Sequence, residues 1–580
     1  MRGGYLAAIC SGGPAQARRK KVEIEAALPG SVRLVFDSGG LLLFSDRSAA
    51  YLTDSSVAIV GEIFARGQKT PSRSLSASEW AAVEGSSGRV LIEAYWGAYA
   101  AFVVHPGGVT VLRGPFADLG CYYTRSGGAV LVASSLALLL TAAKVRRRID
   151  DQALSCHIAY PEWRSSKTCL HDVLELRGGD CLRVASSETA HVSVWSPWRF
   201  VREDMLIGDP DDAVRRVRDA VRMAVAARTT GRKCLLLLSG GLDSAILAAT
   251  LTEAGVEFDC LNLVAGDAAS DERHYAELVA QSLGLCLELR QFKLENTDVR
   301  RSGAAEMPYP VHRCFTQALD DVAADVANAG GAELIVDGGG GDNVFFGSRS
   351  ASMLADCLLT SGLDQRFWTA LRALGDLAQT GTATLLRKAL LRAWFRSRAP
   401  RLPPNTAYLS GDAKAAVATG DRHPWFTPPP DVLPGRASHV ALLTPAQNLV
   451  EAFQAQARYP SISPLASQPV VETCLRVPSW LWIAPGRNRA AARSAFEASL
   501  PPPIIDRRSK GSPTNFVAAI FESNRAVIRE MLLGGVLADA GLIDRPLVAR
   551  ALDRSGPTRD LGFVQIMGLV DAEAWARAQH

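Results

Sequence analysis

The sequence lacks the patterns that mark a disulfide framework, a metal-binding finger or a membrane span. Its eleven cysteines are dispersed and form no CxxC pair, which predicts reduced thiols in a cytosol. The longest apolar run, residues 129–143, is too short to cross a bilayer and contains two serines. The N-terminus has no sustained apolar segment typical of a signal peptide. We therefore expect a cytoplasmic protein without stable membrane insertion.

Two further absences narrow the function. The formal charge of +4 is close to neutral for 580 residues, which argues against a dedicated nucleic-acid binder. No Gly-Lys-Ser/Thr follows the glycine-rich turn, so this is not a Walker A loop, and there is no G-x-G-x-x-G at this turn. The length predicts two or more domains.

The most informative stretch present is KCLLLLSGGLDSAILAAT, residues 233–250. Its apolar run suits a buried parallel strand, and strong helix formers follow the turn. The first N–H groups of a helix lack internal partners, and glycines let a backbone approach phosphate closely. An ordinary glycine-rich turn is the alternative. The predicted nucleotide-binding residues are Ser239, Gly240, Gly241, Asp243 and Ser244, with Leu263 near the end of the next strand.

The chain divides into two predicted domains, residues 1–205 and 206–580. In the first, short apolar runs between turn signals predict a β-sandwich. These runs are Val32–Phe36, Leu41–Phe44, Val57–Val60, Ala98–Val104, Val109–Leu112 and Val130–Ala133. In the second, apolar strands alternate with helical segments, which predicts a parallel α/β sheet with ligands beyond the carboxyl ends of its strands. After 234–238, the expected strands are 257–264, 285–289 and 332–336.

The last expected strand runs into DGGGGDNVFFG, residues 337–347. Gly338, Gly339, Gly340 and Gly341 are expected to leave space and to turn backbone N–H groups toward a ligand. Asp342 would then lie near Asp243. Two carboxylates beside a triphosphate suit Mg²⁺, which accepts one or two carboxylates plus phosphate oxygens. The alternative is a glycine hinge with a capping aspartate.

These motifs resemble those of a known family. SGGLDS resembles the PP-loop of ATP pyrophosphatases, which grips the pyrophosphate of ATP while AMP passes to a carboxylate. Together with the four-glycine motif and the segments 459–472, 486–501 and 507–511, it resembles the asparagine synthetase family. Residues 60–64, 97–101 and 112–115 resemble that family's glutaminase-like (N-terminal nucleophile) sandwich. The resemblance implies such a sandwich followed by a PP-loop-type parallel α/β domain, with ATP and Mg²⁺ as cofactors.

The resemblance also implies roles for residues in the last third of the chain. Lys510 would neutralise charge on the activated intermediate, and Arg489 would hold pyrophosphate, as expected where charge builds up on a leaving group. The alternative for both is solvated surface charge. Glu451 is the nearest candidate general base. It is offset by about one turn (~3 residues) from the position where β-lactam synthetases hold a catalytic glutamate, and a solvated glutamate is the alternative.

Two departures from the family narrow the prediction. The glutaminase needs a cysteine after the initiator methionine, whose free amine serves as the base. Here Arg2 stands there and Cys10 is internal, so we predict no glutamine hydrolysis. Asparagine synthetases and β-lactam synthetases carry Glu and Tyr, respectively, where this chain has Gly339.

The form DGGGGDN instead resembles lasso-peptide cyclases (macrolactam synthetases). These adenylate an Asp or Glu side chain of a precursor peptide, whose N-terminal amine then displaces AMP. The resemblance implies a precursor peptide, a leader-binding protein and a leader protease as partners, and no nucleic acid. A wide glycine-lined pocket would suit a folded peptide. The alternatives are a small-molecule amide ligase of the asparagine synthetase or β-lactam synthetase type, and a non-catalytic scaffold. A tRNA-modifying PP-loop enzyme is disfavoured by the sandwich and the modest charge.

Two stretches belong to no motif. Residues 386–402 are basic and amphipathic and include Trp394 and Phe395. They are predicted either to dock a peptide, a partner protein or a membrane surface, or to form an ordinary helix with a basic face. Residues 421–436, rich in proline and glycine, are predicted to form a loop or lid.

Overall fold

A computed structural model describes residues 4–46, 49–185, 188–264, 272–454, 459–508, 511, 513–553 and 562–580. All eleven cysteines are free thiols, as predicted from their spacing. No helix within these ranges combines the length and apolarity of a membrane crossing.

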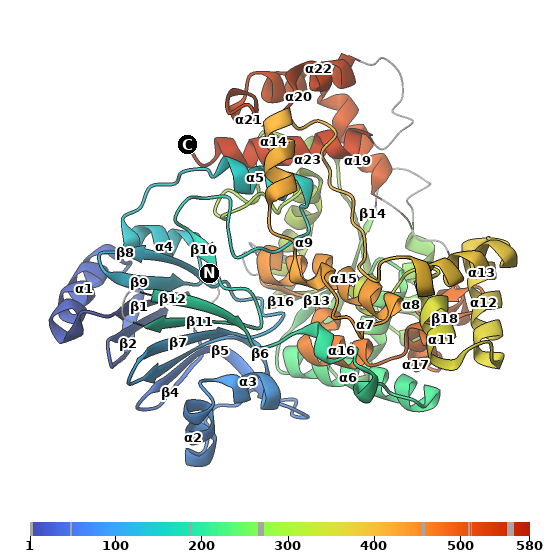
Figure 1. Cartoon of the computed structure of the whole chain (residues 1–580), viewed down its shortest axis with the longest axis horizontal. Coiled ribbons are helices and arrows are strands. Elements are labelled where there is room, and N and C mark those ends of the chain that lie inside the picture. Colours follow the sequence, from blue (N-terminus) through green and yellow to red (C-terminus); the bar gives the residue numbers. More distant parts are fainter. Residues whose placement is uncertain are drawn as a thin grey trace.

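The N-terminal region is a sandwich of two antiparallel six-stranded sheets, as predicted (Figure 1). All six predicted strands are present. The first sheet has the order β10-β8-β9-β1-β3-β2 and the second β12-β11-β7-β6-β5-β4. The strands are β1 (Tyr5–Cys10), β2 (Val32–Ser38), β3 (Leu41–Asp46), β4 (Tyr51–Thr53), β5 (Val57–Ala65), β6 (Tyr95–His105), β7 (Gly108–Arg113), β8 (Tyr122–Ser126), β9 (Ala129–Ala133), β10 (Leu174–Glu175), β11 (Asp180–Ala185) and β12 (Glu188–Ser193).

Successive side chains of β1 point to opposite faces of the first sheet. Tyr5, Ala7 and Ile9 pack between the sheets, while Leu6 and Ala8 face the outer helices α1 (Gly13–Ala27) and α4 (Leu136–Ala143). Helices α2 (Ala77–Gly85) and α3 (Arg89–Ala94) cover the second sheet (Figure 1). The sandwich therefore has helix, sheet, sheet and helix layers.

The second region contains a parallel sheet of order β15-β14-β13-β16-β17. Its strands are β13 (Cys234–Leu237), β14 (Phe258–Val264), β15 (Leu287–Gln291), β16 (Leu334–Val336) and β17 (Ser461–Ile462). Helices α6 (Pro210–Thr229), α7 (Leu242–Glu253), α8 (Arg273–Leu283) and α9 (Gln317–Gly330) complete the alternation. The predicted parallel α/β region is thus confirmed, although β15 begins two residues later than expected and β17 was not predicted.

The other helices vary in length, and those nearest the C-terminus gather at the top of the molecule (Figure 1). These other helices are α5 (Asp151–Ala159), α10 (Gly341–Val344), α11 (Ser352–Ser361), α12 (Gln365–Ala378), α13 (Thr382–Leu390), α14 (Gly411–Thr419), α15 (Pro434–Asn448), α16 (Gln468–Leu475), α17 (Ala490–Phe496), α18 (Pro502–Ile505), α19 (Thr514–Ser523), α20 (Arg525–Leu533), α21 (Val536–Asp539), α22 (Arg545–Asp553) and α23 (Gly562–Arg577).

The two unassigned stretches differ in part from expectation. The helical part of 386–402 stops at Phe395, after α13 and a π-helical turn, η5 (Leu391–Phe395). In 421–436, Trp425 and Phe426 form a short 3₁₀ turn and are 7% and 8% exposed. The Trp425 ring packs against Phe116 and Trp195 of the sandwich. The predicted loop is therefore packed against the sandwich and ends where α15 begins at Pro434, and a lid stays a prediction.

Candidate active site

The SGGLDS turn links the end of β13 to the start of α7, as the sequence predicts. Gly240 has a φ of 75°, and a Cβ there would come within 2.8 Å of Tyr275 Cβ and Ala276 N. A residue with a side chain would be strained and crowded at this position. The loop is closed by its own hydroxyls, since Ser239 N donates to Ser244 Oγ at 3.2 Å. The N-terminus of α7 thus opens at the carboxyl edge of the sheet.

Asp243, Asp342 and Arg489 meet beside this loop. Nη1 of Arg489 lies 3.0 Å from both carboxylate oxygens of Asp243 and 2.5 Å from Oδ1 of Asp342. Asp243 belongs to the first turn of α7, Asp342 to α10, and Arg489 directly precedes α17. The Asp243 and Arg489 residues are 6% and 7% exposed, whereas the Asp342 side chain is 46% exposed. Three predicted site residues from distant segments therefore share one cluster.

The sequence interpretation missed Arg507, which holds the same loop. Its Nη1 donates to the carbonyl oxygen of Gly240 at 2.8 Å, and its guanidinium stacks 3.8 Å above the Tyr275 ring. Arg507 also pairs with Glu272, which accepts the Gly511 N–H at 2.6 Å. The sequence feature that could have revealed Arg507 is the basic segment 507–511, in which only Lys510 was given a role. Lys510 itself lies outside the described residues.

The four-glycine turn is tightly packed, which corrects the expectation that it leaves space. A Cβ on Gly341 would come within 2.6 Å of Asp243 Cγ, and one on Gly338 within 3.1 Å of Asp243 Cβ. Gly340 has a φ of 76°, and a Cβ there would lie 3.0 Å from Ala466 Cβ and 3.1 Å from Ala446 Cβ. A Cβ on Gly339 would overlap Leu449 Cδ2. The glycines thus allow the backbone turn to contact the SGGLDS loop, and no wide pocket opens at them.

Buried polar contacts fix the base of this turn. Asp337 accepts the Gly339 N–H at 2.7 Å and Nε2 of Gln454 at 3.1 Å. Burial raises the pKa of Asp337, and these hydrogen bonds oppose the shift. On the neighbouring strand, Asn262 donates to the Leu238 carbonyl at 2.7 Å. Leu263 follows it near the end of β14 and is partly buried.

Glu451 is fully buried, so the alternative that it is a solvated glutamate on a helix face is wrong. It belongs to a π-helical turn, η7 (Leu449–Phe453). Its carboxylate accepts N–H groups of Phe116 at 3.3 Å and Gly178 at 3.0 Å, both from the sandwich region. Arg113 Nη2 donates to its carbonyl oxygen at 3.0 Å. Burial raises the pKa of Glu451, and the charge of Arg113 opposes the shift. This geometry packs the sandwich against η7 and does not support a general base.

The donor set of the cluster fits Mg²⁺. Asp243 and Asp342 already converge on one cationic atom, Nη1 of Arg489. Mg²⁺ binds through one or two carboxylates together with phosphate oxygens. Within the described part of the chain, no group of three or more His, Cys, Asp or Glu side chains forms a metal cage. Asp243 and Asp342 are the residues that would hold the ion with a bound nucleotide.

Comparison with known proteins identifies the family. Residues 216–577 match the model of the asparagine synthase family, and because this is more than half of the chain, the protein belongs to that family. Membership supports an ATP-dependent, amide-forming ligase in general. No curated protein matches the chain.

Two solved structures align with about half of the chain. One is an allosteric regulatory enzyme of purine biosynthesis, with 9% identity over 50% of this chain and 80% of its own, and a TM-score of 0.21. The other is glutamine phosphoribosylpyrophosphate amidotransferase from B. subtilis complexed with ADP and GMP, with 9% identity over 58% and 90%, and a TM-score of 0.21. Similarity this low supports no conclusion about fold or function.

Proposed function

We propose that this chain is an ATP-dependent, AMP-forming lasso-peptide cyclase. It would activate an Asp or Glu side chain of a precursor peptide and close an isopeptide bond with the peptide's N-terminal amine. The observation that carries the proposal is the convergence of Asp243 and Asp342 on Arg489 beside the SGGLDS loop. Ligands of open parallel sheets bind at this edge.

The reaction balances without any other co-reactant. An oxygen of the substrate carboxylate attacks the α-phosphorus of ATP, the bond to the β-phosphate breaks, and pyrophosphate leaves. The amine then attacks the acyl carbon, AMP leaves, and a base takes the proton of the amine. Backbone N–H groups at the start of α7 and the hydroxyls of Ser239 and Ser244 would bind the pyrophosphate. Arg489 would neutralise its charge, and bound Mg²⁺ would supply further charge neutralisation.

The state of the sandwich favours an amine supplied by the substrate. Arg2 stands where the glutaminase needs a cysteine. Cys10 ends β1 and is 7% exposed, and burial raises the pKa of its thiol. A buried thiol is a poor nucleophile because the thiolate is the reactive form. Ammonia from glutamine is therefore not expected.

A small-molecule amide ligase is the second candidate, and one observation favours it. Leu449 lies against Gly339, so the turn lacks the wide opening that a folded peptide would use there. The third candidate, a scaffold that kept the fold without catalysis, would be favoured if any AMP formation measured with the wild type stayed unchanged when Asp243 is replaced. Leader-binding and protease partners, and a place in the cytoplasm, belong to the first proposal.

One experiment separates these candidates. The chain is mixed with ATP, Mg²⁺ and the leader-free form of a short precursor encoded beside its gene. The cyclase proposal predicts AMP, pyrophosphate and a peptide lighter by one water. AMP formation with aspartate and ammonium, but not with the peptide, would favour the small-molecule ligase. ADP formation would reject both ligase proposals.

A further inference from the structure

The two stretches that match no motif meet at one large cavity. It has a volume of about 1030 Å³ and is walled by residues 150–169 on one side and by residues 397–406 and 414–426 on the other. Arg401 and Leu402 come from the first unassigned stretch, and Arg422 and Phe426 from the second. We propose that this chamber binds an acidic segment of the peptide substrate. The inference rests on the proposed function and names a site for its substrate apart from the Asp243–Asp342 cluster.

The floor of the chamber is aromatic. The rings of Tyr160 and Trp163 stack with centroids 3.8 Å apart and an angle of 3° between their planes. Phe426 lies 5.0 Å from Trp163, centroid to centroid. Tyr160 and Trp163 remain partly exposed. Such rings offer large apolar area with a fixed orientation, which suits peptide side chains.

The rim of the chamber is cationic. Four exposed side chains line it and make no ion pair with any residue in the described ranges: Lys167, Arg401, Lys414 and Arg422. Opposing them are two carboxylates, Asp150 and Asp421. Arg164, deeper in the wall, is neutralised by Glu175. Burial lowers the pKa of His157 to about 4, so this ring is neutral at physiological pH. The excess of unpaired cations favours an anionic ligand.

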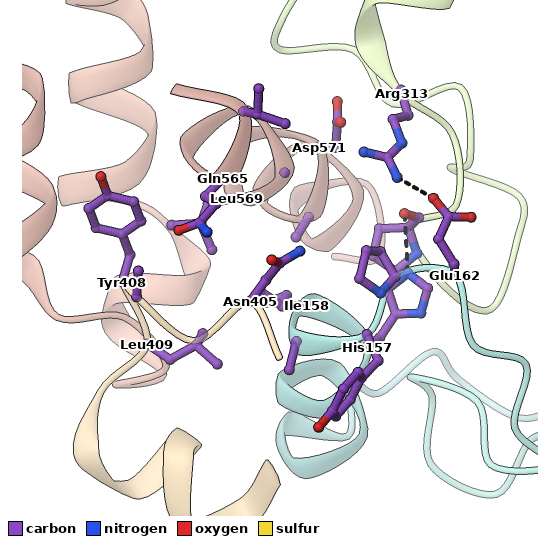
Figure 2. A pocket seen from close by; sticks show the side chains of 18 of the residues that line it. His157, Ile158, Glu162, Arg313, Asn405, Tyr408, Leu409, Gln565, Leu569 and Asp571 are labelled. Carbon is purple, nitrogen blue, oxygen red and sulfur yellow. Dashed lines mark hydrogen bonds and ion pairs between the residues drawn. The ribbon is translucent and has the colours of Figure 1, made fainter. Parts of the chain in front are cut away.

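The size of the chamber favours a peptide over a small anion. Pockets for drug-sized ligands have volumes of about 300–1,000 Å³, so a single amino acid would leave most of this space empty. A second cavity of about 370 Å³ lies on the other side of Leu402 and Pro403, which line both. Figure 2 shows Asn405 and Tyr408 on its wall, with Arg313 and Glu162 paired at one side. An extended chain could follow residues 400–404 from one cavity toward the other.

The chamber wall is connected to the four-glycine turn. Nδ2 of Asn448 donates to the carbonyl oxygen of Pro161 at 3.4 Å and to Glu162 Oε2 at 3.3 Å. These residues directly precede Trp163. The residue after Asn448 is Leu449, which lies against Gly339. Two consecutive residues thus link the loop that lines the chamber to the turn that contacts Asp243.

The test measures binding without chemistry. A pooled library of short synthetic peptides rich in aspartate is passed over the immobilised full chain in the absence of ATP, and retained sequences are read by mass spectrometry. The same library with asparagine in place of aspartate is the matched probe. The double variant K167E/K414E reverses two exposed charges of the rim. The variant K69E reverses an exposed charge that does not line the chamber.

We expect the wild type and K69E to retain aspartate-containing peptides, and K167E/K414E to retain them at least tenfold less. Equal retention by the double variant, or no preference for the aspartate library, would overturn the inference. Preferential retention of an added oligonucleotide over the peptides would overturn it too. Failure of the proposed function is distinguishable, since AMP formation is measured separately and peptide retention requires no turnover. Because Lys167 and Lys414 are exposed, the double variant should fold like the wild type. Thermal melting is the measurement that checks this.

Discussion

Nη1 of Arg489 lies between the carboxylates of Asp243 and Asp342, 3.0 Å from the first and 2.5 Å from the second. Two carboxylates held this close repel each other unless a positive charge separates them. The guanidinium of Arg489 thus lies between the two carboxylates, where a bound Mg²⁺ would also contact them. This arrangement explains how the two aspartates stay together, and it leads to the first prediction.

Replacing Arg489 with Met should destabilise the chain and make it respond to Mg²⁺. Asp243 and Arg489 are 6% and 7% exposed, and breaking such a pair costs about 3 kcal/mol because one buried charge loses its partner. Added Mg²⁺ should therefore raise the Tm of R489M more than that of the wild type or of R489K. Thermal melting across a magnesium series measures this. An equal rise in Tm with Mg²⁺ in all three proteins would contradict the claim that Asp243 and Asp342 can hold the ion.

Replacing Gly339 with Ala should lower stability, and a second substitution should restore part of it. The new methyl would overlap Leu449 and lie 2.7 Å from Asp337 Oδ1, and overpacking of this kind costs about 1–3 kcal/mol. Because Leu449 is one source of the overlap, L449A should cost less in the G339A background than alone. A double-mutant cycle measured by chemical denaturation gives the coupling. Strict additivity would mean that Leu449 does not fill the space at Gly339.

Replacing Glu451 with Gln should affect stability and leave the chemistry in place. The carboxylate accepts N–H groups of Phe116 and Gly178 in a fully buried site, so a side-chain NH₂ group there would leave a donor unpaired at a cost of about 1–3 kcal/mol. The pH dependence of AMP formation should keep its shape in E451Q. Loss of the acidic limb, where a general base becomes protonated, in a folded variant would instead restore Glu451 as the general base. R113M, which removes the cation beside it, should be destabilised more strongly.

Acid should destabilise the protein through His439. This ring is buried and hydrogen-bonds to the Val344 carbonyl oxygen at 2.9 Å, and burial lowers its pKa from 6.5 to about 4. The unfolded chain takes up the proton near pH 6.5 and the folded chain only near pH 4. The stability is therefore fully present above pH 6.5 and falls by about 3 kcal/mol as the pH drops to 4. Unfolding measured against pH should be flatter over this range for H439Q than for the wild type. Identical slopes would contradict the assignment.

The sequence predicted the parts of the fold that depend on local periodicity. The strand–turn–helix at SGGLDS follows from an apolar run, two glycines and a helical segment. The short strand β17 was not predicted because two residues are too few to show an alternating pattern. The strand is defined by its parallel pairing with β16. The run 129–143 became strand β9 and helix α4, with Ser135 capping the helix through the Leu138 N–H.

The sequence predicted that Asp243 and Asp342 lie close together, but it did not predict how tightly the four-glycine turn is packed. The approach of Asp243 and Asp342 follows from parallel strands ending at one edge. The packing of Leu449 on Gly339, by contrast, depends on a helix more than a hundred residues later, which no local pattern reveals. Arg507 was missed for the same reason, since its contact with Gly240 joins segments far apart in the chain. The burial of Glu451 depends on the sandwich, whose packing against η7 leaves no trace in the helical pattern around it.

The central claim is that a substrate carboxylate attacks the α-phosphorus of ATP at the Asp243–Asp342 cluster. The most direct test uses a leader-free precursor peptide whose side-chain carboxylates carry ¹⁸O, incubated with ATP and Mg²⁺. Mass spectrometry of the released AMP should show one ¹⁸O atom per molecule in the wild type, and D243N and D342N should release no labelled AMP. Unlabelled AMP from the wild type, or ADP as the product, would contradict the account.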